Sequence, residues 1–545
     1  MINTTNAQVL STPAEANTSA WDAIIIGAGM GGGSIAHALC QAGQNVLLIE
    51  KGNIEFATEG LGVQIEQEDP DERLMHGKWP TKLRIQVNGR AADLWAPLGC
   101  GVGGSTLLYA AALQRLEPMD FASREGPSGQ PLEWPFSYDQ LQPYYQKAES
   151  LFSVKGGVDP RDTESQYALP EPPTMSGYDA VFFKECEKAG LNPYRIHVAI
   201  DYTSPDCGEC GGNICTIQCK RNTYNSAIAP ALASGQLTIL AECEVDKLEA
   251  DQNAVTGVVV SKNGETVTLA VGSANLVLSA GSYFSPVLLL KSSNEHWPDG
   301  LANSSGMVGR NLMFHASEFI AFWLPSKASR NGPKKTVAVR DFYEHDGVKL
   351  GEVQSTGRVA DYGLVLYALR LMFDASAYRF LKPVRQLLRI PAYLAAKLYG
   401  KATIYATIVE DFPYPENRIN YDSDAPSGIR VEYHVRKEFE ERVVMLRQLI
   451  RKSLKGIKSM PMNQGVNLNY GHPCGTIKAG NDKSTSVLDA NCKAHDLDNL
   501  YVVDGSFMPT SGGTNPSLTI AANALRVADQ IIARRASTPE EQLAS

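Results

Sequence analysis

Apolar and polar positions follow their most regular pattern between residues 21 and 52. A continuous apolar run at 23–26 predicts a buried strand, a small-residue segment at 32–42 predicts a helix, and an apolar run at 45–49 predicts a second strand. Gly27, Gly29 and Gly32 lie around the start of the helix, and Glu50 follows the second strand. This order predicts a β-α-β unit with an acidic residue at its end.

The three glycines of this unit have the spacing G-x-G-x-x-G. Glycines at these positions let the backbone turn tightly and approach a pyrophosphate, which binds at the N-terminus of the helix. Glu50 is placed to accept hydrogen bonds from an adenosine ribose. A plain strand-to-helix turn would leave Glu50 unexplained, so the pattern predicts dinucleotide binding.

A second glycine-rich loop follows a polar stretch at 54–94. Glycines at 99, 101, 103 and 104 precede a serine and a threonine. Such a loop brings backbone N–H groups close to a planar or anionic ligand. A loop that caps a helix is the alternative interpretation.

The middle of the chain has a different pattern. Apolar positions at 237–240 and 255–260 predict an antiparallel ribbon, and the run at 274–281 predicts a buried strand. Aromatic and β-branched residues alternate at 317–323, 404–409 and 428–433, which predicts a largely antiparallel sheet with one covered face.

A helix is predicted at 133–155, and two more, at 378–401 and 437–459, interrupt or follow the strands of this sheet. The helix at 378–401 is basic and amphipathic, so it could contact a membrane surface. A lid that packs on the core with a solvated basic face is the alternative. The chain ends with a strand at 500–503, then Asp504, a glycine loop and a helix from Pro516, a pattern typical of a nucleotide-binding segment.

Composition excludes several classes of protein. The 545 residues carry a formal net charge of −9 without a basic block, so nucleic acid is not an expected partner. No apolar run reaches the roughly 18 residues of a membrane span. The first 20 residues lack the features of a secretory signal, and ten cysteines without a signal suggest reduced thiols in the cytoplasm. Residues 1–20 and 536–545 are expected to be flexible.

Four sequence blocks resemble the glucose–methanol–choline (GMC) oxidoreductases, flavoenzymes that oxidise alcohols. The first is the N-terminal fingerprint, and the others are GVGGSTLLYAAAL at 101–113, GSYFSPVLLLKS at 281–292, and GHPCGT at 471–476 together with DGSFMPTSGGTNPSLTIAANALRVAD at 504–529. Ser293 and Tyr109 depart from the family pattern, which usually has glycine and asparagine there.

The resemblance implies an α/β fold with a Rossmann-like FAD-binding domain built from separated segments. These segments are expected at 21–130, 225–315 and 465–535. An inserted α+β substrate-binding or cap domain, with a largely antiparallel sheet, is expected at 131–224 and 316–464.

The resemblance also implies which residues hold FAD. Some relatives carry a flavin-linking histidine where this chain has Leu107 and Leu108, so FAD is expected to bind without a covalent bond. The implied cofactor residues are Gly27, Gly29, Gly32, Glu50, Gly103, Gly104, Ser105, Thr106, Val245, Asp504, Gly505, Asn515 and Pro516.

His472 matches the catalytic histidine of the family, and Asn515 matches a second catalytic position. Alcohol oxidation removes the hydroxyl proton as hydride leaves carbon for flavin N5, and a neutral imidazole suits that proton. A histidine that caps a loop carbonyl, and an asparagine that caps the helix after it, are the alternative interpretations. Asn515 can serve both as the second catalytic residue and as the cap of the helix that follows it.

The cysteines Cys207, Cys210, Cys215 and Cys219 form the pattern C-x2-C-x4-C-x3-C. An iron–sulfur cluster is one interpretation, because related sugar dehydrogenases hold three irons on closely spaced cysteines in this part of the chain. Zinc is a second, and free thiols or a disulfide-stapled loop a third.

The sequence therefore predicts an FAD-dependent oxidoreductase that acts on CH–OH groups of an alcohol, sugar or sterol-like substrate. The expected partners are that substrate and an electron acceptor, which is oxygen, a quinone or a redox protein. A flavoprotein of the same fold with non-oxidative or light-driven chemistry, such as a lyase or decarboxylase, is the alternative function.

Overall fold

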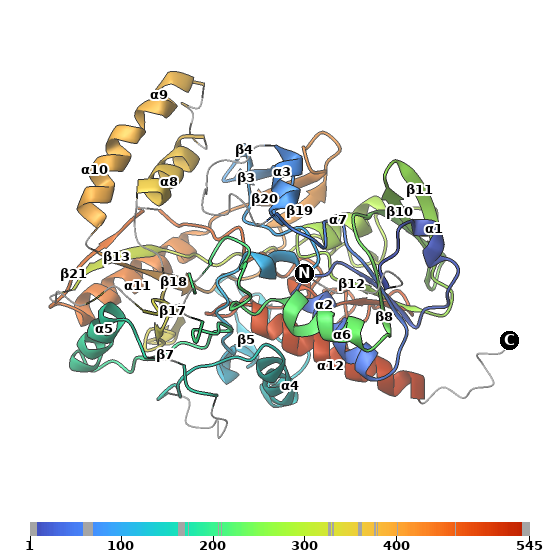
Figure 1. The fold of residues 1–545 in the computed structure, drawn as a ribbon, viewed down its shortest axis with the longest axis horizontal. Helices are drawn as coiled ribbons and strands as arrows, with labels where there is room; N and C mark the ends of the chain where they lie inside the picture. The colour runs from blue at the N-terminus through green and yellow to red at the C-terminus, as the bar shows by residue number, and fades with distance from the viewer. Residues whose placement is uncertain are drawn as a thin grey trace.

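The computed structural model places the nucleotide-binding pattern and the antiparallel sheet in two regions joined by several crossings of the chain (Figure 1). It describes residues 8–57, 69–161, 169–172, 174–204, 207–208, 210–324, 329, 332–357, 362–374, 376, 378, 380–400, 402–463 and 465–536. No helix among these residues is long and apolar enough to cross a membrane.

A five-stranded parallel sheet is the centre of the first region. Its strands are β22 (Leu500–Val502), β12 (Asn275–Leu278), β1 (Ala23–Ile26), β2 (Val46–Ile49) and β8 (Leu237–Leu240), in that order. Every paired strand runs parallel. Continuous apolar runs suit these strands because both faces of a parallel sheet are buried. The sheet confirms the predicted α/β class.

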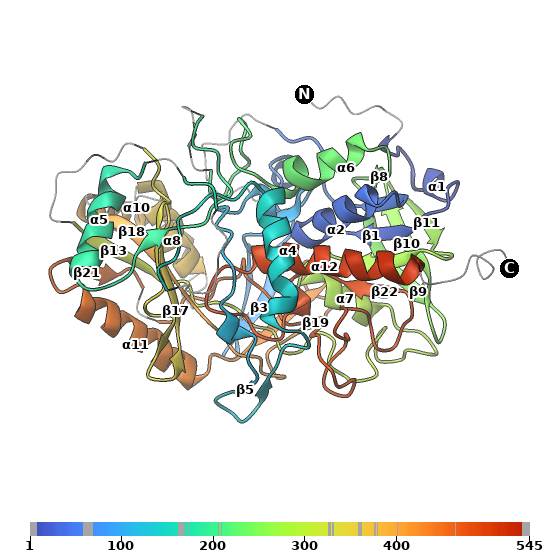
Figure 2. The same cartoon turned by 90° about the horizontal axis from the view of Figure 1, so that it is seen from below.

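Two helices lie side by side next to this sheet, and a third crosses one of them (Figure 2). The first two are α2 (Met30–Gln41) and α12 (Ser517–Ala536), and α4 (Tyr138–Leu151) crosses α12. Ser137 begins α4 with a capping box that it forms with Gln140. The Tyr145 hydroxyl lies 2.8 Å from that of Thr519, which joins α4 to α12. The helix α4 therefore packs on the nucleotide-binding region, although the predicted domain division assigns it to the cap.

A six-stranded antiparallel sheet is the centre of the second region. Its order is β21 (Lys458–Pro461), β13 (Phe319–Trp323), β18 (Thr403–Val409), β17 (Gly351–Ser355), β14 (Val337–Val339) and β7 (Tyr194–Arg195). The helix α11 (Lys437–Ser453) packs Phe439, Val443, Leu446 and Ile450 into the same core as Phe322 of β13. These positions have the spacing of one helix face.

The remaining strands form smaller sheets. One contains β19 (Arg418–Tyr421), β20 (Ile429–Tyr433), β3 (Leu83–Val87) and β4 (Arg90–Leu94), and another contains β9 (Glu244–Ala250), β10 (Val255–Lys262) and β11 (Glu265–Ala270). Two ribbons pair β5 (Arg124–Glu125) with β6 (Pro131–Leu132), and β15 (Glu344–His345) with β16 (Val348–Lys349). The other helices are α1 (Pro13–Ala16), α3 (Pro70–Met75), α5 (Gly177–Lys188), α6 (Ala229–Ala233), α7 (Phe284–Lys291), α8 (Tyr362–Asp374), α9 (Lys382–Leu387) and α10 (Arg389–Tyr399).

Several predicted elements differ from the observed ones. The predicted ribbon of 237–240 with 255–260 is wrong, because β8 pairs in parallel with β2 while β10 lies between β9 and β11. The helix predicted at 378–401 is two helices, α9 and α10. The helix predicted from Pro516 begins one residue later.

The N-terminal segment is also more structured than predicted. Residues 8–20 pack on the nucleotide-binding region: Val9 bridges Ile239, and Ala16 of α1 is buried. Residues 1–7 and 537–545, where flexibility is predicted, lie outside the described residues.

Candidate active site

A cavity of about 1610 Å³ is lined by residues from both regions. It extends from the turn after β1, past the second glycine loop, to residues of β17 and β18. Of the predicted cofactor and catalytic residues, all but Gly32 and Gly103 line it. Segments more than 400 residues apart in the chain therefore meet at one site.

The first fingerprint forms one wall of this cavity. Gly29 precedes α2, and a Cβ built on it would have no atom within 4 Å. A Cβ on Gly32 would lie 1.9 Å from the Gly27 carbonyl oxygen. Gly29 thus leaves open space at the N-terminus of α2, where a phosphate binds favourably, whereas Gly32 permits the close approach of the helix to the turn.

Glu50 joins the two glycine loops. Its Oε2 accepts a hydrogen bond from Ala28 N at 2.9 Å, and its Oε1 accepts from Gly52 N at 2.9 Å and Gly101 N at 3.1 Å. Burial raises the pKa of this carboxyl, and the three N–H groups oppose that shift. Glu50 therefore holds the turn in place as well as lining the cavity, and the ribose contact stays a prediction.

The second glycine loop lies directly against the first. Gly103 N donates to Ala28 O at 3.1 Å, and Gly103 has a φ of +124°, which favours glycine. Gly104, Ser105 and Thr106 line the cavity beyond it. The loop thus contributes its backbone to the cavity wall, and the approach of its N–H groups to a ligand stays a prediction.

Asp504 lies at the carboxyl end of the sheet, two residues after the end of β22. Its Oδ2 accepts from Gly281 N at 2.9 Å and from Ser285 Oγ at 2.5 Å. Beside it in the cavity wall, the hydroxyl of Ser279 is buried and has no hydrogen-bond partner. Open space beside Gly29, a helix N-terminus and an unpartnered hydroxyl fit a bound dinucleotide.

His472 pairs with a second histidine, His315. The two Nδ1 atoms lie 3.2 Å apart, and His315 Nε2 lies 3.0 Å from the carbonyl oxygen of Gly512. Burial lowers the pKa of His315 to about 4, so this ring is neutral at neutral pH. A carbonyl can only accept, so Nε2 of His315 carries the proton and its Nδ1 accepts from His472 Nδ1–H.

The hydrogen bond to His315 determines which ring nitrogen of His472 carries the proton. With its proton on Nδ1, the ring has an unprotonated Nε2. Loss of hydration, followed by the proximity of His315 and Lys335, lowers the pKa of His472 well below its usual value. His472 lines the cavity as a neutral imidazole with a free acceptor nitrogen. His315 lies just before the strand pattern predicted at 317–323, and no motif in the sequence marks it as the partner of His472.

Asn515 is held by two glutamines that the sequence did not single out. Its Nδ2 donates to Gln114 Oε1 at 3.2 Å and to Gln354 Oε1 at 3.1 Å. Gln114 Nε2 in turn donates to Glu352 at 2.8 Å. Both N–H bonds of the Asn515 amide are thereby occupied, which leaves Oδ1 as the acceptor that the side chain offers to the cavity. The nearest sequence signal was that Gln114 directly follows the second block.

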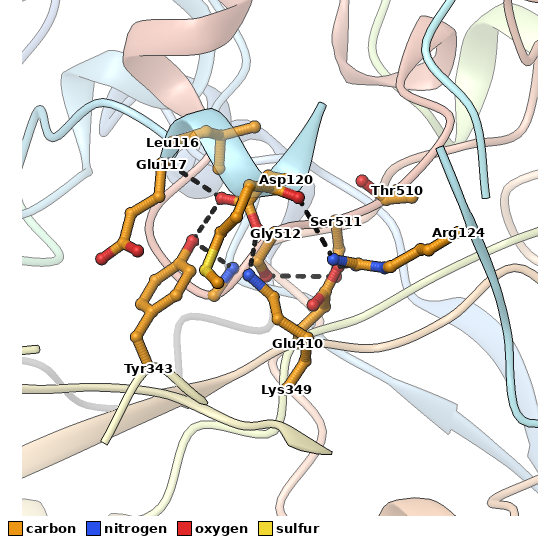
Figure 3. Close-up of polar contacts among 12 residues, drawn as sticks. Leu116, Glu117, Asp120, Arg124, Tyr343, Lys349, Glu410, Thr510, Ser511 and Gly512 are labelled. Carbon is orange, nitrogen blue, oxygen red and sulfur yellow. Dashed lines mark hydrogen bonds and ion pairs between the residues drawn. The ribbon is translucent and has the colours of Figure 1, made fainter. Parts of the chain in front are cut away.

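A buried polar network lies behind the loop that precedes Asn515 (Figure 3). Asp120 accepts from Lys349 Nζ at 2.5 Å and from the Tyr343 hydroxyl at 2.6 Å, and the Tyr343 oxygen accepts from Gly513 N at 2.9 Å. Gly512, the carbonyl partner of His315, is therefore next to a residue that the network anchors.

The four clustered cysteines lie near the cavity. The Sγ of Cys219 lies 3.3 Å from that of Cys207 and 3.4 Å from that of Cys215. Lys220 Nζ donates to Leu107 O at 2.9 Å and to Cys210 O at 2.7 Å, which joins the cysteine loop to the second glycine loop. Across the described ranges, no group of three or more His, Cys, Asp or Glu residues is arranged to hold a metal ion, so the iron–sulfur interpretation has no structural support.

Comparison with known families identifies two matching models. The N-terminal GMC oxidoreductase model matches residues 21–317, and the C-terminal GMC oxidoreductase model matches residues 413–524. Together the two models include the glycine loops, Asp504, His472 and Asn515.

Individual relatives match along nearly the whole chain. Paromamine 6'-oxidase from Streptomyces fradiae is 27% identical, with 94% of this chain and 91% of the relative covered. 2-Methyl-1,2-propanediol dehydrogenase from Mycolicibacterium austroafricanum is also 27% identical, with 94% and 95% covered. The crystal structure of pyridoxine 4-oxidase from Mesorbium loti shares the fold, with a TM-score of 0.61 and 20% identity over 94% of this chain and 99% of that one.

Proposed function

The chain belongs to the GMC oxidoreductase family, and we propose that it is an FAD-dependent enzyme that oxidises a CH–OH group of an alcohol or sugar. The observation that carries the proposal is a single cavity lined by the fingerprint loop, Asp504, His472 and Asn515. Relatives named as a paromamine oxidase and a propanediol dehydrogenase support substrates with CH–OH groups.

The residues of the cavity wall would hold FAD along its length. The N-terminus of α2 beside Gly29 would bind the pyrophosphate, because its N–H groups and dipole favour negative charge. The N-terminus of α12, next to Pro516, lies in the part of the cavity that Asn515 also lines. When bound, FAD supplies the acceptor for the hydride of the substrate.

His472 and Asn515 are proposed to act on the substrate hydroxyl. The unprotonated Nε2 of His472 takes the hydroxyl proton as the C–H bond breaks. Asn515 contacts the substrate oxygen and is kept in one orientation by Gln114 and Gln354. His315 is a positioning residue, because it acts only through His472.

The electrons leave the reduced enzyme for oxygen, a quinone or a redox protein. A cytoplasmic location is part of the proposal, and the ten free cysteines support it, because thiols stay reduced in that compartment.

An anaerobic screen of alcohols and sugars tests the proposed function. A substrate is expected to bleach the flavin absorbance of the purified protein without any added acceptor. Failure of every primary and secondary alcohol, sugar and sterol to bleach a protein that retains FAD would contradict the proposal.

The FAD is expected to leave the protein when the chain is denatured. Leu107 and Leu108 have no group that can form a bond to the isoalloxazine. Purified protein should be yellow, and acid or heat should release all the flavin into the supernatant after the polypeptide is removed. Flavin that stays with the precipitated chain, seen by mass spectrometry of peptides, would contradict non-covalent binding.

Replacement of His315 is expected to slow the reaction without changing substrate affinity. His315→Leu removes the acceptor for His472 Nδ1–H, so the ring is free to place its proton on Nε2, and loss of such an orienting partner costs about 10- to 100-fold in activity. His315→Asn keeps an acceptor near the original Nδ1 position and should restore most of the rate. Rapid-mixing flavin reduction measures both variants, and equal losses in the two would indicate only a packing role.

A further inference from the structure

The helices α8, α9 and α10 project from one end of the molecule (Figure 1), and their outer surface is apolar. Eleven of the seventeen exposed large apolar side chains among the described residues lie between positions 362 and 398. Leu387, Ile390, Leu394 and Leu398 follow the spacing of one helix face, and their exposed fractions are 57% to 63%. They form a continuous stripe, which we call the apolar stripe.

The inner face of α10 carries smaller side chains. Ala392 is buried, and Ala395 and Tyr399 pack with it against Val365 and Leu369 of α8. A surface helix of a globular protein normally turns its large apolar residues toward the core. In α10 the alanines face the protein and the leucines face outward, so packing among the described residues does not explain the apolar stripe.

The charge of this segment is opposite to that of the whole chain. Six lysine and arginine residues and a single acidic residue, Asp374, lie between positions 362 and 399, whereas the chain has a net charge of −9. Arg389 and Lys397 are exposed on α10, and Lys397 Nζ lies 4.6 Å from the centroid of the Tyr393 ring. Exposed basic residues beside an apolar stripe match the headgroups and acyl chains of an anionic lipid surface.

We propose that α8, α9 and α10 dock on the surface of a bilayer that contains anionic phospholipids, with the apolar stripe inserted among the upper acyl chains. The exposed aromatic residues Tyr378, Phe380 and Tyr393 suit the boundary between headgroups and acyl chains. The docked helices lie in the plane of the surface, since no described helix can span a membrane.

A second copy of the chain fits this surface less well. A symmetric contact through the apolar stripe would bring the exposed Arg389 and Lys397 of one copy toward the same residues of the other. Asp374 is the one acidic residue of the three helices, and it is already bonded to Arg385. Phospholipid phosphates supply that negative charge without any contribution from the chain.

Docking in this way would place part of the cavity wall next to the bilayer. Arg370 and Asp374 of α8 and Arg385 and Gln386 of α9 line the cavity that contains His472. Arg385 Nε donates to Asp374 Oδ1 at 2.9 Å, which ties α9 to α8 beneath the projecting surface. The lipid-facing and cavity-facing sides therefore belong to the same helices.

Flotation of the FAD-loaded protein with vesicles tests the proposal. Wild-type protein should float with vesicles of phosphatidylcholine and phosphatidylglycerol, and binding to pure phosphatidylcholine should be at least tenfold weaker. The double variant Ile390→Glu/Leu394→Glu should lose binding to both. Arg389→Glu/Lys397→Glu should weaken binding to the anionic vesicles by on the order of fivefold or more per residue, and added salt should remove that difference.

The matched control is Val444→Glu/Tyr421→Glu, which places the same two charges on exposed apolar residues outside the projection. It should float like wild type. Equal FAD content and melting temperature in all variants exclude unfolding. Vesicle binding does not depend on turnover, so it can be measured whether or not an alcohol is oxidised. Absence of binding to anionic vesicles, or a wild-type dimer that Ile390→Glu/Leu394→Glu dissociates in sedimentation velocity, would overturn the proposal.

Discussion

Flavin reduction in the His472→Ala variant is expected to be roughly 10²- to 10⁴-fold slower than in wild type, the usual cost of losing a general base. His472 offers an unprotonated Nε2 to the cavity because its Nδ1 proton is held by His315. Alanine leaves the substrate hydroxyl without a proton acceptor. The measurement is rapid-mixing flavin reduction with a substrate found in the anaerobic screen.

The pH profile gives an independent check on this assignment. Burial lowers the pKa of His472 well below its usual value, and only the neutral ring accepts a proton. The wild-type rate should therefore stay level through neutral pH and fall only in acid, as the pH drops through the lowered pKa. His472→Ala should lack this acid limb.

Two variants separate the role of His472 from general effects. Asn515→Ala should cost less than His472→Ala, because it removes an oxygen contact but not the proton acceptor. His345→Ala, at an exposed histidine of β15, should leave the rate unchanged. FAD should remain bound in all three proteins. A His472→Ala protein that reduces its flavin at the wild-type rate at every pH would show that the base is another residue.

Gly29→Ala is expected to weaken FAD binding while the chain still folds. A Cβ at this position meets no protein atom within 4 Å, and the backbone φ of −74° suits alanine. The added methyl group would occupy the space proposed for the pyrophosphate. Overpacking of about 1–3 kcal/mol corresponds to a loss of affinity of roughly 5- to 150-fold. Titration of the apoprotein with FAD, followed by flavin fluorescence, measures it.

Gly32→Ala is expected to destabilise the fold itself, whether or not FAD is bound. Its Cβ would lie 1.9 Å from Gly27 O, so the strand-to-helix turn has to open whether FAD is present or not. The apoprotein should show a lower melting temperature than either Gly29→Ala or the surface control Gly456→Ala, whose Cβ also meets open space. If Gly29→Ala binds FAD like wild type, the pyrophosphate does not pass this residue.

Local patterns in the sequence were sufficient for the parts of the fold that depend on neighbours in the chain. The first β-α-β unit was predicted because its apolar runs, its glycine spacing and Glu50 lie within about thirty residues of one another. The α/β class and the family were predicted for the same reason, since they rest on contiguous blocks. The antiparallel sheet was predicted only in part: β13 and β18 share it, but the strand predicted at 428–433 is β20, which lies in a separate sheet with β19, β3 and β4 and pairs in parallel with β3. The helices at 133–155 and 437–459 were placed correctly but extended too far.

Strand pairing and the partners of the site residues depended on the tertiary structure. The apolar run of β8 is compatible with either a parallel or an antiparallel neighbour, and only the fold pairs it with β2. Asn515 is oriented by Gln114 and Gln354, and His472 by His315. These partners are more than 150 residues away, and a lone glutamine or histidine carries no pattern in the sequence. The chain thus determined by itself that it binds a dinucleotide, whereas the proton positions and side-chain orientations at the site were decided only when distant segments came into contact.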